Sequence, residues 1–460
     1  MVRVASAPRV VIVGCGAAGV TAAKYAKAAD KCSTVTVLEK RGYAVYHQCS
    51  IPDAISGTVK LSSLVGEPPS APGLEIRTSI LVEDVDAGGR VVHARDLRSG
   101  EKLKLEFDAL VLATGSKPHV PRYLRIEDSC GVFTVKTLED AAAIMEAAGK
   151  HPSAAVVGGS ALGVEIAHAL ALRGVKVALV ELSPHLLPGE LDPDVAREVE
   201  GRLRAEGVEL ALGDGASEIS GEVGAKRVVT ASGKVLGAGF VVVATGVRAN
   251  NELAKRMGLE IGATGGVRVD ERMATSVDGI YAAGSVAEVR ELLTGKPILS
   301  PFASTAYLTG RVAGINAVGG RAKLRGVLRS WVANIGGFKF GATGLTEAEA
   351  REAGFNALSV TIAVRDKPAF YPDSKQLTVK LVADGESGRV LGVQVAGEGG
   401  ALETLNLAAA AIAGGFTLEG LRDLELAHTP SLNDVPHPLC VASEILLHRL
   451  GRGWRWCAER

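Results

Sequence analysis

The feature that most constrains the fold is a glycine-rich turn that occurs twice, at residues 14–19 and 158–163. Each copy follows a short apolar run and precedes a helical stretch, and a second apolar run then ends in an acidic residue, Glu39 or Glu181. This order predicts strand, turn, helix and strand, with a pyrophosphate at the helix N-terminus and ribose hydroxyls on the carboxylate. The sequence therefore predicts two Rossmann-like domains and two bound dinucleotides.

The two turns differ at their second glycine position and in the residues around the acid. Ser160 stands where Gly16 stands in the first turn, so the backbone approach is slightly more crowded. Glu181 would repel a 2′-phosphate, and no arginine follows it closely, which favours NADH and leaves NADPH as the second choice. The positions expected to bind cofactor are Gly14, Gly16, Gly19 and Glu39 in the first unit and Gly158, Ser160, Gly163, Glu165 and Glu181 in the second.

Two later apolar runs with the same ending indicate how the domains are interleaved. They are LVLATG at residues 110–115 and VVVATG at residues 241–246. We expect a first dinucleotide-binding domain at 1–117 and 247–325, which is interrupted by a second at 118–246. A strand before Gly284 and a helix after Pro301 complete the first domain.

The remaining residues, 326–460, predict a separate α+β domain. Alternating segments at 358–364, 376–382 and 390–395 read as antiparallel strands, and helical patterns follow at 401–413 and 418–424. The fold class is therefore α/β, with two Rossmann-like domains and a C-terminal α+β domain.

Bulk charge and hydropathy exclude several classes of protein. The chain has 51 basic and 51 acidic residues, which does not favour nucleic acid or an anionic membrane surface as a partner. No apolar run approaches the ~20 residues of a membrane span, and the first strand begins without a charged and apolar leader. We therefore expect a cytoplasmic enzyme of small-molecule chemistry.

Any cysteine chemistry must start from a single thiol. The six cysteines form no C-x-x-C and no close pair, so neither a zinc site nor a two-cysteine redox motif is expected. Cys49 lies shortly after the strand that ends in Glu39, and Pro52 marks a helix start that would lower the pKa of a nearby thiol. The alternative for Cys49 is a buried apolar cysteine without chemistry.

Taken together, these motifs resemble the FAD-dependent pyridine nucleotide-disulfide oxidoreductases. Both turns, both ATG strands, the glycine turn at Gly284 and the single cysteine before a proline carry the resemblance, which extends to 341–347 and Tyr371-Pro372. The most similar branch is the single-cysteine one, with coenzyme A-disulfide reductases, persulfide reductases and NADH oxidases. It implies FAD in the first domain, NAD(P)H in the second and a homodimer formed by the third. Further cofactor-binding positions implied by the family are Ala113, Thr114, Gly115, Gly246, Gly284, Ser285 and Thr305.

The same resemblance implies a reaction. Electrons pass from NAD(P)H through FAD to Cys49, which reduces coenzyme A disulfide or a related disulfide, persulfide or polysulfide. Lys24 and Lys27 are candidates for coenzyme A phosphates, with a solvated helix face as the plainer alternative. Two other functions stay open, namely an NADH oxidase that uses oxygen and a non-enzymatic flavin redox sensor.

The family also implies that the partner subunit completes the site. Tyr371 and His428 would face Cys49 of the other chain, although Ser285 and His428 depart from the family pattern, which has aspartate and tyrosine there. His428 would stabilise the thiolate and return a proton to the leaving thiol. The alternative for His428 is a cap on the adjoining turn.

Overall fold

The computed structural model describes residues 7–453. The chain divides into two compact units, each built from separate stretches. Unit 1 contains Met1–Ile51, Val59–His119 and Val247–Arg329, and unit 2 contains Pro52–Thr58, Val120–Gly246 and Ser330–Arg460. The expected three-domain boundaries at 117, 246 and 325 lie near these limits, and the division of unit 2 into two domains stays a prediction.

Unit 1 is built on a five-stranded parallel sheet, with strand order β22-β9-β1-β2-β5. Its strands are β1 (Arg9–Val13), β2 (Thr34–Glu39), β5 (Leu74–Thr78), β9 (Ala109–Leu112) and β22 (Ile280–Ala282). The strand order reverses direction between β1 and β9, which is the place where open α/β sheets bind nucleotides. The first glycine turn follows β1 and therefore lies at this point.

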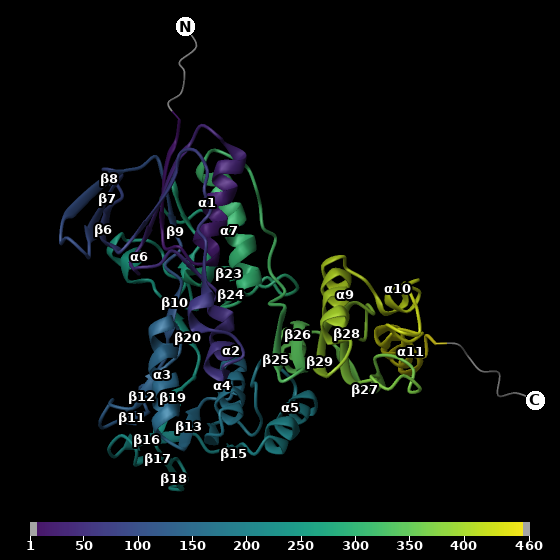
Figure 1. Ribbon diagram of the computed structural model, residues 1–460. Coiled ribbons are helices and arrows are strands. Elements are labelled where there is room, and N and C mark those ends of the chain that lie inside the picture. Colours follow the sequence, from purple (N-terminus) through teal and green to yellow (C-terminus); the bar gives the residue numbers. More distant parts are fainter. Residues whose placement is uncertain (1–6, 454–460) are drawn as a thin grey trace, which may run out of the picture. The chain divides into compact units, whose positions relative to one another are not determined.

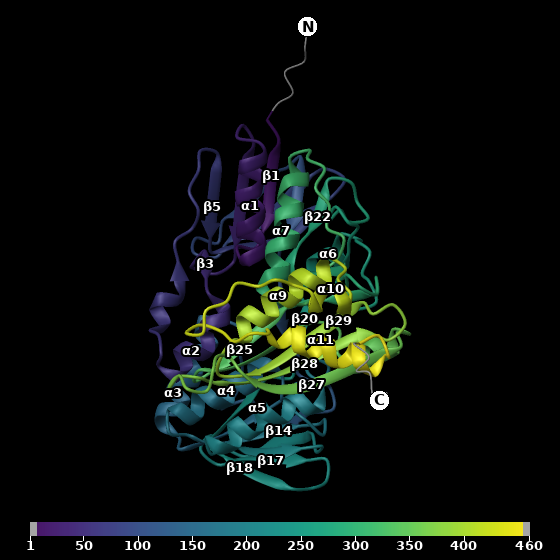
Figure 2. The same cartoon turned by 90° about the vertical axis from the view of Figure 1, so that its right-hand side faces the viewer.

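Two helices of unit 1, α1 (Ala17–Ala29) and α7 (Ala303–Ala317), lie side by side in Figures 1 and 2. A Cβ at Gly310 would lie 2.4 Å from the carbonyl oxygen of Ala18, so the backbones touch because α7 carries glycine there. The hydroxyls of Tyr25 and Tyr307 are hydrogen-bonded at 2.6 Å. This packing fixes the helix that begins at the first turn.

Smaller strands and a short helix complete unit 1. An antiparallel sheet contains β6 (Ile80–Asp86), β7 (Val91–Asp96) and β8 (Lys102–Glu106), and a second contains β21 (Val267–Arg268), β23 (Ala287–Arg290) and β24 (Pro297–Leu299). The pairs are β3 (Val45–Tyr46) with β4 (Val65–Gly66) and β10 (Ser116–Pro118) with β20 (Val247–Ala249), and the helix is α6 (Glu252–Arg256). The pairing of β10 with β20 joins the two places where the chain leaves and re-enters this unit.

Unit 2 repeats the parallel sheet, with strand order β12-β19-β13-β14-β15. Its strands are β12 (Val132–Thr134), β13 (Ser153–Val157), β14 (Lys176–Glu181), β15 (Glu209–Leu212) and β19 (Phe240–Val243), and its helices are α3 (Leu138–Lys150), α4 (Ala161–Leu172) and α5 (Pro193–Ala205). A four-stranded sheet of β11 (Arg125–Ile126), β16 (Ala216–Ser220), β17 (Lys226–Thr230) and β18 (Val235–Ala238) is added to it. The second glycine turn joins β13 to α4.

The C-terminal part of unit 2 is a five-stranded antiparallel sheet, with strand order β25-β26-β29-β28-β27. Its strands are β25 (Trp331–Ile335), β26 (Phe338–Gly344), β27 (Ala357–Arg365), β28 (Gln376–Asp384) and β29 (Val390–Gly397). Helix α9 (Ala401–Ala413) packs on β26 and β29, and α11 (Pro438–Arg449) packs on β27 and β28. Helices α8 (Glu347–Glu352) and α10 (Leu418–Arg422) are shorter. Two Rossmann-like sheets and an α+β region confirm the expected fold class.

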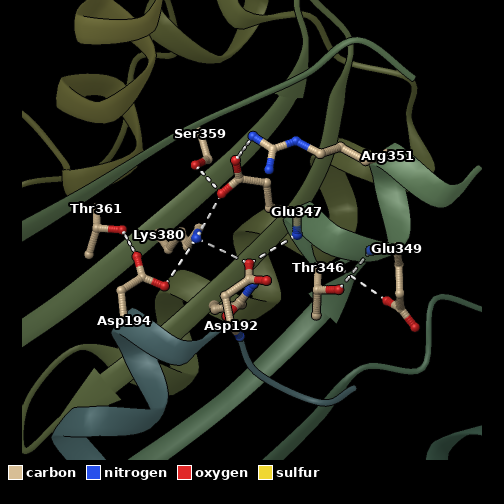
Figure 3. A network of polar contacts seen from close by, with 10 residues as sticks. Asp192, Asp194, Thr346, Glu347, Glu349, Arg351, Ser359, Thr361 and Lys380 are labelled. Carbon is tan, nitrogen blue, oxygen red and sulfur yellow. Dashed lines mark hydrogen bonds and ion pairs between the residues drawn. The ribbon is translucent and has the colours of Figure 1, made fainter. Parts of the chain in front are cut away.

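A buried ion cluster joins the nucleotide-binding and C-terminal parts of unit 2 (Figure 3). The ammonium of Lys380 on β28 lies 3.2 Å from Asp192, 3.0 Å from Asp194 and 3.0 Å from Glu347. Burial lowers the pKa of Lys380, but hydrogen bonds and charge from these three carboxylates outweigh it and raise the pKa. Because α5 begins directly after Asp192, the cluster fixes this helix on the C-terminal sheet.

Within residues 7–453, no helix is both long enough and apolar enough to cross a membrane.

Candidate active site

The first glycine turn has the shape that a pyrophosphate requires. Gly14 has a φ of +102°, and a Cβ there would lie 2.3 Å from the carbonyl oxygen of Ala113. A Cβ at Gly19 would lie 1.9 Å from the carbonyl oxygen of Gly14, whereas a Cβ at Gly16 would meet nothing within 4 Å. Gly16 is the N-cap of α1 and supplies no side-chain acceptor, so backbone amides of the first turn stay available for an anion. These residues fit the diphosphate of FAD.

The carboxylate expected to hold the ribose is already bound by the protein. Glu39 is buried and accepts the Cys15 backbone N–H at 2.9 Å and the Arg41 Nε–H at 2.9 Å. The Arg41 guanidinium also lies 4.7 Å from the centre of the Tyr46 ring. A ribose hydroxyl must therefore share Glu39 with Arg41, a residue that the sequence analysis did not single out although it stands two positions after the acid.

Cys15, the second residue of the first turn, lies in surroundings that do not suit redox chemistry. The thiol is fully buried, and burial, followed by the charge of Glu39, raises its pKa to about 12. A thiol with this pKa is protonated at neutral pH and is a poor nucleophile.

The other cofactor positions expected in unit 1 lie around this turn. A Cβ at Gly284 would lie 2.7 Å from that of Ala18, so the Gly284 turn directly contacts α1. Thr114 donates its hydroxyl to the carbonyl of Asn250 at 2.8 Å, and this contact places Gly115 next to the returning chain. Ser285 is half-buried beside Gly284. The structure thus brings Gly14, Gly19, Ala113, Gly284 and Ser285 together.

Thr305 differs from this expectation in one respect. It is buried in the first turn of α7, and its hydroxyl accepts a hydrogen bond from Ser300 at 2.8 Å. The hydroxyl of Thr309 in turn accepts the backbone N–H of Gly284 at 2.9 Å. Thr305 supports the Gly284 turn through its backbone carbonyl, which accepts the Thr309 hydroxyl at 2.8 Å.

The second turn repeats the backbone geometry of the first. Gly158 has a φ of +109°, and a Cβ there would lie 2.6 Å from the carbonyl oxygen of Ala244. The side chain of Ser160 is the N-cap of α4: it accepts the Gly163 N–H at 3.3 Å and donates to Ala244 at 2.9 Å. The hydroxyl is thus turned towards the protein, and the crowding expected at Ser160 is reduced.

Glu181 occupies the place in unit 2 that Glu39 occupies in unit 1. Its carboxylate accepts the Gly159 N–H at 2.6 Å and the Ser183 N–H at 2.8 Å. Both partners are backbone groups, and no cation is bonded to Glu181 among the described residues. The negative charge therefore remains, which favours ribose hydroxyls over a 2′-phosphate.

Glu165 in α4 is an unusual carboxyl group. Burial, followed by the charges of Asp53 and Glu190, raises its pKa to about 8. Glu190 itself accepts the backbone N–H of Ala161 at 3.2 Å, in the first turn of α4. The Glu165 carboxyl is therefore largely protonated at neutral pH in the protein without nucleotide.

Cys49 lies in a single 3₁₀ turn, Gln48–Ser50, and is exposed in the single chain. Helix α2 (Ile51–Ser56) begins two residues later, with Pro52 in its first turn, and this confirms the expected helix start. Cys32 and Cys130 are also exposed, Cys440 is buried, and Cys457 lies outside the described residues. Exposure excludes the buried, apolar alternative for Cys49.

Tyr371 and His428 lie on two loops of the C-terminal part of unit 2. Lys367 connects these loops, because its ammonium bonds Asp373 on one loop and the carbonyl of Ser431 on the other, at 2.5 and 3.5 Å. His428 is exposed, and its Nδ1 lies 3.3 Å from the Asn433 side-chain oxygen, whereas the turn-cap alternative places the imidazole on a backbone group. Within one chain, Cys49 belongs to unit 1, whereas Tyr371 and His428 belong to unit 2.

Comparison with known proteins assigns the family. Residues 8–305 match the pyridine nucleotide-disulphide oxidoreductases, and residues 335–439 match the dimerisation domain of the same family. The chain is 34% identical to an NADH oxidase of Methanocaldococcus jannaschii, over 96% of this chain and 99% of that protein. It is 34% identical to an NAD(P)H coenzyme A polysulfide/persulfide reductase of Pyrococcus horikoshii, over 95% and 98% of the two chains.

A solved structure shows the same relationship. The NAD-dependent persulfide reductase of A. fulgidus superposes with a TM-score of 0.91 at 32% identity, over 96% of this chain and 83% of that one. The chain belongs to the pyridine nucleotide-disulphide oxidoreductase family. It is an NAD(P)H-dependent flavoprotein oxidoreductase with FAD and NAD(P)H as its cofactors, in agreement with the two glycine turns. Because these matches concern whole domains, the roles of individual site residues stay predictions.

Proposed function

We propose that this protein reduces coenzyme A disulfide or a related persulfide or polysulfide, with Cys49 as the redox sulfur. The observation that carries the proposal is the position of Cys49, which is exposed and lies in the unit that contains the first glycine turn. When bound, FAD accepts a hydride from NADH and makes two electrons available for sulfur. The residues around the turns bind and orient the cofactors, with Glu181 favouring NADH.

The proposed chemistry at Cys49 is thiol exchange. The thiolate attacks one sulfur of the substrate disulfide, forms a mixed disulfide with that half and releases the other half as a thiolate. Two electrons and one proton then convert the mixed disulfide into the Cys49 thiolate and the second thiol. His428 would donate the proton to the leaving sulfur.

Only one of the two lysines considered for coenzyme A supports this proposal. Lys24 is exposed on α1. Lys27 is buried, and its ammonium donates to the carbonyls of Lys31, at 2.8 Å, and Ser33. Lys27 is therefore a weaker candidate for coenzyme A phosphates than Lys24, because its ammonium is already bonded to the loop after α1.

We infer that the working form is a homodimer in which Tyr371 and His428 of one chain face Cys49 of the other. The dimerisation-domain match includes both loops. These loops also expose large apolar side chains, with Phe370 and Leu432 each 76% exposed and Val435 60% exposed. Apolar surface of this kind is typical of a surface that is covered in the assembled protein. The cytoplasmic location expected from the sequence stays a prediction.

An assay with Cys49→Ser tests the redox role. The variant should lose disulfide reduction and keep the reduction of flavin by NADH, because hydride transfer does not need the thiol. Cys440→Ser, which removes a buried thiol, is the control and should keep most activity. Equal disulfide reductase activity in Cys49→Ser and wild type would contradict the proposed role.

Mixed dimers test the shared site. In a dimer of one Cys49→Ser chain and one His428→Ala chain, one site keeps both groups and the other has neither. A site built across the dimer should therefore retain about half of the wild-type activity if its two sites work independently. A mixed dimer no more active than the two parent variants would show that the site is not shared.

A second function is favoured by one specific observation, the similarity to a named NADH oxidase. In that case oxygen takes the electrons and Cys49 cycles through a sulfenate. NADH consumption without oxygen, measured with a panel of disulfides and persulfides, should be fast for a reductase and absent for an oxidase. The relatives from M. jannaschii and P. horikoshii are both named as enzymes, which supports these two functions over a redox sensor.

A further inference from the structure

Helix α2 directly follows the Cys49 turn and has little stability of its own. It contains six residues, Ile51–Ser56, and isolated helices of this length do not form in water. The side chains of Ile51, Ala54 and Ile55 are buried. The position of α2 is therefore set by what it packs on and by contacts at its ends.

The C-terminal end of α2 is bound by a residue from a distant part of the sequence. The Arg173 Nη1 donates a hydrogen bond to the carbonyl oxygen of Ile55 at 3.0 Å, across 118 positions. The last carbonyls of a helix lack partners within the helix and carry the negative end of its dipole, so a guanidinium stabilises them. The chain then leaves α2 through Gly57, which has a φ of +89°.

Arg173 is also the C-cap of α4, the helix that begins at the second glycine turn (Figure 1). The same helix acts on the other end of α2, because the charge of Asp53 contributes to the raised pKa of Glu165. Helix α2 is thus in contact with α4 through its C-terminal carbonyl and interacts with it through its first-turn carboxylate. One helix carries the second nucleotide turn at its start and the anchor of α2 at its end.

The chain connects this anchor to the sulfur over a very short distance. It passes from unit 1 to unit 2 between Ile51 and Pro52, two residues after Cys49, and returns at Val59. One residue spans at most about 3.6 Å, so the short connection between Cys49 and α2 cannot absorb a displacement of the helix. The Cys49 turn must therefore move with α2. We propose that Arg173 is a positioning residue for the Cys49 sulfur and acts through helix α2. The inference rests on the proposed redox role of Cys49.

The test measures the surroundings of Cys49 apart from turnover. The flavin-loaded Arg173→Ala enzyme is alkylated with iodoacetamide without oxygen, and each thiol is followed by mass spectrometry. The rate at Cys49, relative to the exposed thiols Cys32 and Cys130, should change by about threefold or more. Arg173→Lys, which keeps a donor and the charge, should restore most of the wild-type ratio.

Kinetics give the second measurement. In Arg173→Ala, kcat for disulfide reduction should fall roughly tenfold, because small displacements of a reacting group are costly. The KM for NADH and the rate of flavin reduction should stay unchanged, since neither needs the sulfur. A general loss of structure would change all three quantities together.

Arg204→Ala is the matched control. It removes an exposed arginine of α5 that pairs with Glu200 at 3.3 Å, and it should leave the alkylation ratio unchanged. A folded Arg173→Ala with the wild-type ratio overturns the proposal. If Arg173→Ala does not fold, Arg173→Met, which keeps the apolar stem, is judged by the same criterion. The alkylation ratio does not depend on activity, so its failure is distinct from a failure of the Cys49→Ser assay.

Discussion

The two glycine turns share their backbone and differ in the groups around it. In both, a Cβ on the first glycine would lie within 2.6 Å of a carbonyl of the ATG strand, Ala113 or Ala244. In both, the acid at the end of the second strand accepts the N–H of the residue after that glycine, Cys15 or Gly159. The fold therefore builds one kind of turn twice.

The difference lies in what neutralises the acid and caps the helix. Arg41 pairs with Glu39, whereas the matching Ser183 gives Glu181 only a backbone N–H. Gly16 leaves the first helix without a side-chain cap, whereas Ser160 caps the second. The first turn therefore leaves its helix N-terminus open to a phosphate, and its acid is paired with a cation. The second turn has a capped helix N-terminus, and its acid is bonded only to backbone groups. Backbone geometry alone does not decide which cofactor each turn binds.

Alanine at the first glycine of each turn should separate their cofactors, and it has the largest expected effect. Gly14→Ala introduces a clash at 2.3 Å and an unfavourable φ, so the protein should be purified without flavin. Gly158→Ala, the matched change, should keep the flavin and raise KM for NADH roughly tenfold or more. The flavin absorbance per chain is the measurement. Flavin loss in Gly158→Ala and retention in Gly14→Ala would reverse the assignment.

The regions around the two turns are held in place by different kinds of interaction, and substitution of Lys380 tests this difference. The helices beside the first turn are joined by backbone contact, whereas the region of the second is tied to the C-terminal sheet by buried ions. Lys380→Met leaves Asp192, Asp194 and Glu347 without their shared cation, which should cost about 3 kcal/mol of stability. Thermal denaturation should show unit 2 unfolding at a lower temperature.

Lys375→Met is the control for the ion cluster. Lys375 forms an exposed ion pair with Glu398, and its removal should change stability by less than about 1 kcal/mol. Equal midpoints for Lys380→Met and Lys375→Met would mean that the buried cluster does not hold unit 2 together.

The helices that begin at the two turns also differ at matching positions, seven residues after the first glycine of each turn. This difference should make stability depend on pH. In α1 this residue is Thr21, whose hydroxyl bonds its own helix at 2.7 Å, and in α4 it is Glu165, with a pKa raised from 4.5 to about 8. The folded state binds an extra proton between these values, so stability is greatest below pH 4.5 for this group and is lost as pH rises through 8. At about 1.4 kcal/mol per pKa unit, the full loss of stability should be on the order of 5 kcal/mol.

Glu165→Gln tests this pH dependence in the protein without nucleotide. The decrease in denaturation midpoint from pH 5 to pH 8.5 should become smaller, because the amide cannot release a proton. Glu198→Gln, on an exposed position of α5, should keep the wild-type slope. An unchanged slope in Glu165→Gln would show that Glu165 ionises normally in the folded protein.

The smallest expected effect concerns the two acids. Glu181→Ala should raise kcat/KM for NADPH relative to NADH by about tenfold, or about 1.4 kcal/mol, since the repulsion of a 2′-phosphate is removed. Glu39→Ala should weaken flavin binding and leave the coenzyme ratio unchanged. A wild-type enzyme that prefers NADPH tenfold would show that residues other than Glu181 decide.

Local pattern was sufficient to predict most of the fold. The helix predicted at 401–413 is α9, and the first strand, turn and helix lie where the glycines and apolar runs placed them. Helix α11 was missed although Pro438 in its first turn and the His437 cap were visible signals. Strands β25 and β26 were also missed, because short mixed segments resemble loops when their partners are unknown.

The site was less predictable because it depends on which charges the fold pairs. Sequence spacing placed Glu39 and Glu181 correctly, but the pairing of Glu39 with Arg41 depends on side-chain geometry. Lys27 looked like a free helical lysine until the turn after α1 covered it. The contact of Arg173 with Ile55 joins segments that no local pattern connects. Long-range contacts of this kind are set by the whole fold.

The 118 positions between Ile55 and Arg173 also have a consequence for synthesis of the chain. At about 5–20 residues per second, the ribosome needs roughly 6–24 s to reach Arg173 after Ile55 has been made. During this interval the carbonyl oxygen of Ile55 lacks the guanidinium that binds it, and helix α2 is too short to form on its own. A translational pause before residue 173 therefore lengthens the time in which a nascent chain presents this thiol and its apolar neighbours to the cell.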